Sequence, residues 1–506
     1  MDLVTVLPDL LSPLNFALIF LGTCIGLVVG VIPGLSASMA VALLIPFTYS
    51  LSSMTGMSML VAVYVGGISG GCVTAILLRI PGTPSSVATI FDGYPMAEKG
   101  QAGRALGAAV ISSAIGTLVS AAILIFAAPI VARFAVKFYF PEYTAVCIFG
   151  LAAVAALSAD SLVRGLLSTV VGLLVATVGI SESDGLPRFT FGHDMLLGGI
   201  NLLPALIGMY AIAQIMTQMR RTDETKATMV AVNDRVLPRR EDITENLFNF
   251  VRSSILGTLI GIIPAMGGGP AGLISYAQAK NASKRKNEFG KGIPAGVIAS
   301  ETANNATIGG ALIVMLTLGI PGDPVSAILI GGLMIHGLQP GPQLFAQNPE
   351  VIYGIYLSVL LATAIMAIVL LVAARHMARI ARIPEYYLHP ALIILATTGV
   401  YALNTSLFDV GVMFGFGLLG YLFERCRIPL APMVLGLVLG ATLESNFRKM
   451  VGAYGDATPL FTQPIALAFL ILAVVAMVYS IAMPRIAARK ERRDLALGRT
   501  AGTEPT

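Results

Sequence analysis

The sequence predicts an all-α protein that crosses a membrane many times. Of its 506 residues 56% are hydrophobic and 12% are charged, whereas a soluble domain carries about 25% charged residues. The mean hydropathy is +0.84. The apolar runs 105–132, 165–180, 355–374 and 464–483 approach or exceed the roughly 20 residues that span a bilayer as a helix. Because alternating segments typical of a membrane β-barrel are not found, we expect about ten to twelve helical crossings.

The expected membrane segments follow one another along the whole chain, and several are too short to cross alone. In the first half they are 14–33, 35–48, 57–80, 84–91, 105–132, 143–157, 160–180 and 196–218. In the second half they are 247–264, 266–279, 295–320, 323–336, 352–374, 388–403, 408–423, 430–443 and 464–484. Short neighbours such as 14–33 and 35–48 are expected to enter and leave on one side.

Two motifs occur twice, in the same order. GLVVGVIPGLSAS (26–38) aligns without gaps with GTLIGIIPAMGGG (257–269), and AILLRIPGTPSS (75–86) aligns with MLTLGIPGDPVS (315–326). Proline lacks a backbone donor and clashes with the preceding turn, while glycine adds freedom, so each Pro-Gly pair should break a helix. The ordered repetition predicts an internal duplication.

The basic residues predict that the two halves have opposite orientations. After the first motif, 49–57 has no basic residue but 280–291 has five; after the second motif, 92–104 has basic residues and 337–350 has none. Because lysine and arginine mark cytoplasmic loops, corresponding loops should lie on opposite sides of the membrane. We therefore expect two inverted-topology repeats with broken, re-entrant helices.

This pattern predicts five parts. They are a first repeat (1–219), a charged cytoplasmic linker (220–246), a second inverted repeat (247–463), an extra crossing (464–484) and a basic cytoplasmic tail (485–506). The N-terminal stretch has acidic but no basic residues, so it lacks the positive start of a signal peptide. We expect it to remain on the chain and to face the periplasm.

Polar residues beside the breaks are the candidate binding groups. Broken helices inside a membrane must be enclosed, and their free backbone groups can bind substrates and ions. The candidates for substrate binding are Ser36, Ser38, Gly82, Thr83, Ser85 and Ser86. Small residues at such places also simply allow close helix packing, and both interpretations stay open.

The stretch ASETANNATIGG (299–310) is unusually polar for a membrane segment. Ionisable groups there are functional candidates, since an unpaired charge is costly in a membrane. We expect Asn304 and Asn305 to contact substrate. The candidate sodium or proton site is Gly267, Gly268, Glu301, Thr302 and Asp323. Alternatively, Glu301 pairs with the basic run at a helix end.

Arg79 has two interpretations. Its guanidinium matches a carboxylate with parallel hydrogen bonds, which would make it a substrate ligand. It can equally extend to the cytoplasmic interface.

No enzyme class is supported. The chain has no G-x-x-x-x-G-K-[ST], H-E-x-x-H or G-x-S-x-G motif, its four cysteines and four histidines make no metal-ligand spacing, and we expect no cofactor. The net charge of +5 is explained by basic loops and tail, so nucleic acid is not an expected partner.

Several motifs resemble the large membrane subunit of the tripartite tricarboxylate transporters. They are G-x-I-P-G-L (30–35), Y-x-G-G-x-x-G-G (64–71), I-P-G-T-P (80–84), D-G-Y-P-M-A-x-x-G (92–100), G-I-I-P (261–264), E-T-A-N-N-A (301–306) and L-G-I-P-G-D-P (318–324). The resemblance extends from about residue 15 to 480. One departure is Arg79, because the family usually has a small polar residue there; this leaves the substrate's charge and shape open.

The resemblance implies a permease subunit of the bacterial inner membrane. It implies a small four-helix membrane subunit and a periplasmic solute-binding protein as partners. It also implies uptake of tricarboxylates or related organic acids, driven by a sodium or proton gradient. A stand-alone ion-coupled carboxylate symporter without a binding protein is the alternative, and genes for the two partner subunits beside this one would count against it.

Overall fold

The computed structural model describes residues 3–157, 161–181, 184–220, 230–377, 379–380 and 383–496. This described part is almost entirely helical, and its strands form one short antiparallel hairpin, β1 (Gly179–Ile180) with β2 (Pro187–Arg188). Ten of its helices are long and apolar enough to cross a membrane, within the expected range. The prediction of a polytopic helical membrane protein is confirmed.

The helix bounds agree closely with the segments expected from the sequence. The ten candidate spans are α2 (Pro13–Val31), α4 (Ser53–Leu78), α6 (Ala102–Ala135), α7 (Phe140–Leu157), α9 (Leu202–Ile207) continuous through η3 (Gly208–Ile212) with α10 (Ala213–Met219), α17 (Pro349–Met377), α18 (Glu385–Asn404), α19 (Leu407–Arg425), α20 (Leu430–Tyr454) and α22 (Pro464–Ala496). The other long helix is the more polar α14 (Pro294–Leu318). The shorter helices are α1 (Leu3–Leu10), α3 (Ala37–Thr48), α5 (Val87–Glu98), α8 (Leu162–Ala176), α11 (Arg240–Thr244), α12 (Leu247–Ile262), α13 (Gly268–Ala282), α15 (Pro324–Ile335), α16 (Pro342–Gln347) and α21 (Pro459–Thr462). The 3₁₀ turns are η1 (Pro84–Ser86), η2 (Asp194–Leu196) and η4 (Lys286–Glu288).

The chain divides into two compact units. The first consists of Met1–Lys137 and Thr190–Arg425, and the second consists of Phe138–Phe189 and Cys426–Thr506. Each unit therefore combines segments from both halves of the sequence. In the second unit α20 packs on α7 and α8, and α22 packs on α7. An ion pair within this unit joins Arg188 to Glu444 of α20, with 2.6 Å between Nη1 and Oε1.

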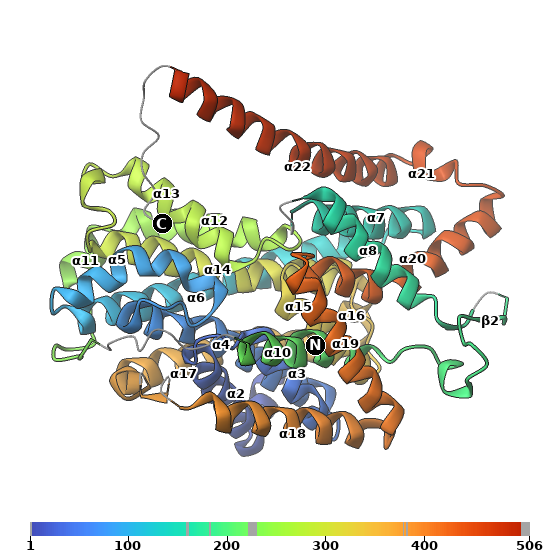
Figure 1. The fold of residues 1–506 in the computed structure, drawn as a ribbon, viewed down its shortest axis with the longest axis horizontal. Helices are drawn as coiled ribbons and strands as arrows, with labels where there is room; N and C mark the ends of the chain where they lie inside the picture. Colours follow the sequence, from blue (N-terminus) through green and yellow to red (C-terminus); the bar gives the residue numbers. More distant parts are fainter. Residues whose placement is uncertain are drawn as a thin grey trace. The chain divides into compact units, whose positions relative to one another are not determined.

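Two buried helices form the core of the first unit. α4 packs against α2, α3 and α17, and α14 packs against α6, α12 and α13 (Figure 1). Nearly every residue of both helices is buried, including the polar residues of α14. A helix enclosed on all sides must satisfy its polar groups within the protein. The polar stretch 299–310 lies inside α14, buried among other side chains and away from the helix ends.

Glycines bring helices into backbone contact in the same way in both halves. A Cβ atom on Gly26 of α2 would overlap the carbonyl oxygen of Val63 on α4. In the second half, a Cβ atom on Gly257 of α12 would overlap the carbonyl oxygen of Ala303 on α14. Small residues permit such close approach of helices. Corresponding positions of the aligned motifs therefore have the same local surroundings.

Both Pro-Gly pairs end a core helix, as predicted. Arg79 follows α4 with a φ of 58°, and Gly319 follows α14 with a φ of 70°. After each break, the next helical turn begins behind a capping box, in which Thr83 pairs with Ser86 or Asp323 pairs with Ser326. The capping side chains satisfy backbone groups that the break releases.

The other two proline motifs also separate helices. Pro33 lies between α2 and α3, and Pro264 lies between α12 and α13. Gly34 and Ala265 have positive φ angles of 87° and 65° in these connections. The first turns of α3 and α13 therefore present N–H groups that have no partner within their own helix.

Part of the charged linker packs on α6 within the first unit. Asp234 accepts hydrogen bonds from the backbone N–H groups of Gly103 and Arg104, at 2.6 and 2.9 Å, and so caps α6. Arg104 also forms an ion pair with Asp242 at 2.5 Å. The linker residues 221–229 and the tail residues 497–506 lie outside the described residues. Helix α22 is continuous from the expected extra crossing into the basic segment, as far as Ala496.

Candidate functional site

The N-terminus of α13 lies against the first break and against α14. A Cβ atom on Gly268 would overlap Asn304 Oδ1 and would lie 2.9 Å from the Cβ atom of Ser85. A Cβ atom on Gly267, whose φ is +58°, would lie 3.6 Å from the Cβ atom of Asp323. Only glycine fits at the first of these positions. Residues of η1, α13, α14 and the start of α15 therefore converge at one junction.

Asn304 has unused hydrogen-bonding capacity at this junction. The residue is 1% exposed, and within the part of the chain that the structure describes neither Nδ2 nor Oδ1 makes a hydrogen bond of ordinary geometry, although Glu301 lies nearby. An unpaired buried polar group costs about 1–3 kcal/mol. The amide offers donors and an acceptor to a ligand, and the first turn of α13 adds N–H groups and partial positive charge. The junction can therefore bind an anionic oxygen.

The first break supplies hydroxyl groups to the junction. Thr83 Oγ1 and Ser85 Oγ lie 3.0 Å apart. Ser86 instead donates to the Thr83 carbonyl oxygen at 2.9 Å and is fully buried. Thr83 Oγ1 is an acceptor in the capping box, and the hydroxyls of Thr83 and Ser85 can turn to donate to a ligand beside Asn304, whereas Ser86 donates within the turn.

Glu301 is fully buried and accepts hydrogen bonds from three side chains. Thr89 on α5 donates to Oε1, while Ser113 on α6 and Asn305 donate to Oε2 at 3.2 and 3.3 Å. Asn305 accepts a hydrogen bond from Ser69 on α4 at 2.7 Å. These partners are all uncharged. A carboxylate in such surroundings is costly without a counter-charge, so this network can hold a proton or a small cation.

Asp323 has partners for both carboxylate oxygens. Oδ1 accepts the backbone N–H of Ser326 at 2.7 Å, which caps α15. Oδ2 accepts the phenolic hydroxyl of Tyr64, which comes from α4 in the other half of the chain. Asp323 therefore joins the second break to the core helix of the first half.

The family of the chain follows from comparison with known proteins. Residues 16–435 match the tripartite tricarboxylate transporter TctA family. The chain belongs to the TctA family. This is a family of transporters, so the resemblance seen in the motifs is confirmed and the chain is a membrane subunit of a tripartite transporter that includes other subunits.

Two relatives of this TctA-family protein occur in Agrobacterium vitis. The chain is 36% identical over 483 residues to an uncharacterised 52.8 kDa protein in the TAR-I ttuC′ 3′ region, and the match covers 95% of this chain and 96% of the relative. It is also 36% identical over 237 residues to an uncharacterised protein in the TAR-II ttuC′ 3′ region, covering 47% of this chain and 98% of that relative. No solved structure matches the chain.

Ser36 and Ser38 of this TctA-family protein lie in a separate polar cluster at the start of α3. Their hydroxyl oxygens are 2.9 Å apart, and Ser36 donates to Gln214 Oε1 at 2.8 Å. Gln214 and Gln218 both donate to the carbonyl oxygen of Gly34. Among the described residues, no hydrogen bond joins this cluster to Asn304.

Three further candidates occupy distinct places. Arg79 is exposed, and its guanidinium lies over the ring of Tyr94, 5.7 Å from the centroid. Gly82 packs against the backbone of α2, where a Cβ atom would overlap the carbonyl oxygen of Gly30. Thr302 is fully buried, and its hydroxyl has no hydrogen-bond partner among the described residues.

Sequence reasoning missed several partners of these candidates. Tyr64 and Ser69 belong to the Y-x-G-G-x-x-G-G motif, which supported the family resemblance but received no role. Gln214 and Gln218 stand four residues apart in an apolar helix, a spacing that places both on one face and was an available signal. Thr89 gave no such signal, because its contact with Glu301 depends on how the two halves fold together.

Proposed function

We propose that the chain is the large permease subunit of a binding-protein-dependent secondary transporter that imports tricarboxylates or related organic acids. Its partners would be a small four-helix membrane subunit and a periplasmic solute-binding protein, and a sodium or proton gradient would drive uptake. Membership of the TctA family supports this function. The observation that carries the site is the buried, unpaired Asn304 amide beside the first turn of α13.

In this proposal a substrate carboxylate binds between the first break and α13. The Asn304 amide and the Thr83 and Ser85 hydroxyls would donate hydrogen bonds to the carboxylate, and the first N–H groups of α13 would add partial positive charge. Binding would replace the missing partners of Asn304. Ser36, Ser38 and Arg79 would act outside this first contact, on the path of the substrate.

The coupling ion would bind near Glu301. Its carboxylate has only hydroxyl and amide partners, and Thr302 next to it has an unpaired hydroxyl. Oxygen ligands of this kind suit sodium, and the carboxylate alone suits a proton. Gly267 and Gly268 place backbone groups of α13 near the same junction, and Asp323 closes its other side.

The architecture we propose is a pair of inverted repeats with re-entrant tips. Three observations support it: the opposite distribution of basic loops, the matching glycine contacts and the matching caps after the two breaks. The N-terminus would face the periplasm and the C-terminus the cytoplasm of a bacterial inner membrane. The two tips would meet near the midplane, and alternating access would move this unit against the remaining helices.

Uptake into proteoliposomes tests the function. Vesicles containing both membrane subunits, with binding protein added outside, are offered labelled mono-, di- and tricarboxylates under separately imposed sodium and proton gradients. We expect uptake of a carboxylate that needs all three proteins and ends when one of the gradients is collapsed. Uptake by the large subunit alone would favour the stand-alone symporter, and no carboxylate uptake under any gradient would reject the substrate class.

Cysteine protection tests the site. Single cysteines at Ser36, Thr83, Asn304 and Asp323 are labelled in a background that lacks the four native cysteines. Substrate and the coupling ion should slow labelling at Thr83 and Asn304 most. If no position is protected, the site assignment is wrong.

A further inference from the structure

Asp92 is a buried carboxylate that the transport site does not use. It is fully buried in α5. Its Oδ1 accepts the backbone N–H groups of Gly290, Gly292 and Ile293, at 2.9, 2.8 and 3.0 Å. Its Oδ2 accepts the hydroxyl of Tyr276 at 2.9 Å. Four donors around one carboxylate form a strong, oriented contact between the two halves of the chain.

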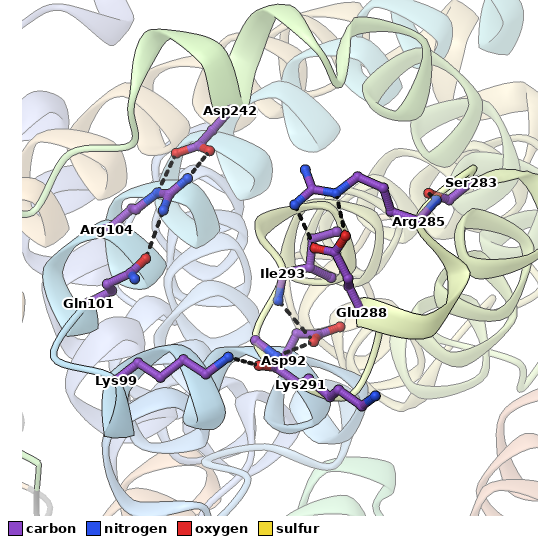
Figure 2. Close-up of polar contacts among 11 residues, drawn as sticks. Asp92, Lys99, Gln101, Arg104, Asp242, Ser283, Arg285, Glu288, Lys291 and Ile293 are labelled. Atoms are coloured by element: carbon purple, nitrogen blue, oxygen red, sulfur yellow. Dashed lines mark hydrogen bonds and ion pairs between the residues drawn. The ribbon is translucent and has the colours of Figure 1, made fainter.

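The backbone around Asp92 fits the carboxylate closely. Gly290 and Gly292 have φ angles of 83° and 92°, and a Cβ atom on Gly292 would lie 2.9 Å from the backbone nitrogen of Met96. A Cβ atom on Gly296 would overlap Asp92 Oδ2. Glycine is therefore required both for the turn and for the approach of α14. Figure 2 shows Asp92 beside Ile293, with Lys99 reaching the Lys291 carbonyl oxygen nearby.

Apolar packing excludes water from this contact. The Tyr276 ring stands edge-on to Phe91 and Phe289, with centroids 5.3 and 5.5 Å apart. The same cluster contains Ala88 and Ile293. Of the two pairs, Tyr276 with Phe289 is buried whereas Phe91 is exposed, and a buried aromatic pair adds about 0.5–1.5 kcal/mol beyond the area it buries. The Asp92 contact therefore lies beside a buried apolar cluster, with the exposed Phe91 at its edge.

The elements that meet at Asp92 are those that form the transport site at their other ends. Ser85 lies about two turns before Asp92, in the turn that leads into α5. Tyr276 lies about two turns after Gly268 on α13, and Asn304 lies about three turns into α14. A single carboxylate thus fixes the spacing of the elements that surround the junction.

The corresponding position in the second half has no such contact. When the two Pro-Gly motifs are aligned without gaps, Asp92 aligns with Gly332. A Cβ atom on Gly332 would meet Leu60 Cδ1 at 3.0 Å, Met57 Sδ at 3.5 Å and Ile45 Cδ1 at 3.9 Å. These neighbours are apolar, so the charged contact occurs in one half only.

We propose that Asp92 with Tyr276, Gly290, Gly292 and Ile293 (the Asp92 latch) holds closed a gate on the side of the basic loops, which lies between the transport site and the cytoplasm. Release of substrate to that side requires α5 to separate from α13 and α14, and the latch must open first. The corresponding contact around Gly332 is apolar, so it can open without breaking buried hydrogen bonds to a charged group. The protein therefore rests with its basic-loop side closed. Asp92 touches no substrate and acts as a positioning residue, and this inference rests on the proposed transport function.

Site-directed labelling tests the latch without needing transport. A Ser85→Cys reporter is placed in a chain whose native cysteines are replaced, and a membrane-impermeant maleimide is applied from either side of oriented vesicles. In Asp92→Asn, labelling from the basic-loop side should be faster by about tenfold or more, since hydrogen bonds to a charged group are lost. Tyr276→Phe, which removes one donor, should give an intermediate rate.

Asp242→Asn is the matched control. Asp242 is also a buried carboxylate bound by an arginine and a backbone N–H group, but it joins the linker to α6 and does not join α5 to α13 and α14. Its variant should label at the wild-type rate. Equal labelling of the Asp92 and Asp242 variants, or equal acceleration from both sides, would overturn the latch.

Two further readouts complete the experiment. If Asp92→Asn does not elute as a folded species, Tyr276→Phe decides alone. Missing substrate protection of the Ser85→Cys reporter would count against the proposed site, but the labelling rates from the two sides would still test the latch.

Discussion

Tyr64 on α4 and Asn304 on α14 occupy corresponding positions in the aligned halves, and each lies near the break of the other half. Of these two residues, only Tyr64 forms a side-chain hydrogen bond there among the described residues. Tyr64 on α4 donates a hydrogen bond to Asp323 at the second break. Asn304, which aligns with Tyr64, lies beside Ser85 at the first break with its amide unpaired. The protein itself thus satisfies the second break, and in the function that we propose the first break binds the ligand. The repeated motifs place similar backbone at both breaks, and the side chains that differ between them are the basis of the roles that we propose for each.

Asn304→Leu gives the largest effect expected from this comparison. The change keeps the approximate shape but removes the groups that we assign to the substrate carboxylate. Because a hydrogen bond to a charged group is worth about 1.5–3 kcal/mol, kcat/KM for uptake should fall by about 10- to 100-fold. Thermal stability in detergent should stay equal or rise, since a buried unpaired amide disappears. If Asn304→Leu instead loses stability but keeps uptake, Asn304 supports the fold and does not bind the substrate.

Tyr64→Phe should show the opposite pattern. Removal of the hydroxyl leaves Asp323 Oδ2 buried without its partner. The free energy of unfolding should fall by about 1–3 kcal/mol, because an unsatisfied buried acceptor bears its desolvation cost. The measurement is unfolding in detergent beside the Asn304 variant. Once folded, the Tyr64 variant should keep most of its substrate affinity; a loss as large as that of Asn304→Leu would mean that both breaks bind the substrate.

Gly319→Ala and Arg79→Ala compare the two helix ends before the breaks. Gly319 has a positive φ, and a Cβ atom there would lie 3.1 Å from the Pro340 carbonyl oxygen, so alanine should destabilise the fold by about 1–2 kcal/mol. Arg79 already has a side chain in the same backbone region. Its replacement should cost only the contact with Tyr94, worth about 0.5–1 kcal/mol at an exposed site. Equal losses in thermal unfolding would show that the two helix ends do not differ in strain.

Local sequence signals predicted the helices and their breaks because these depend on short-range chemistry. Apolar runs set the bounds of α2, α6 and α17, and the proline and glycine pairs ended α4 and α14 where expected. Gly268, Thr83 and Ser85 were also named from their positions beside breaks, and Asn304 was named from the polar stretch 299–310. Local composition therefore carried much of the candidate site.

Contacts between distant segments could not be predicted in the same way. The bond from Thr89 to Glu301 and the four bonds to Asp92 join residues about 200 positions apart, so no periodicity in either segment reports them. Likewise, nothing local distinguishes Ser36 in its glutamine cluster from Ser85 at the junction. Packing of the two halves decides which polar residue meets which.

The smallest effect is expected from acid, which should weaken the ion pair between Arg104 and Asp242. Burial would raise the pKa of Asp242, but the Arg104 guanidinium and the Arg239 N–H group hold that pKa below its ordinary value. Segment 337–350 follows the second motif as segment 92–104, which contains Arg104, follows the first. It has no basic residue to form such a pair. Because the folded-state pKa lies below the unfolded value of about 3.9, the ion pair stabilises fully above that pH and its contribution is lost as pH falls through the folded pKa.

The difference between wild type and Asp242→Asn isolates this contribution from other carboxylates. Below about pH 4, the midpoint of thermal unfolding should fall more steeply for the wild type than for the variant, and the two curves should run parallel at neutral pH. The exposed pair of Arg285 and Glu288 on the same loops should add little, because solvent screens it. If the variant keeps the full acid dependence of the wild type, the ion pair of Arg104 and Asp242 does not hold the linker to α6, and the hydrogen bonds from Gly103 and Arg104 to Asp234 hold it instead.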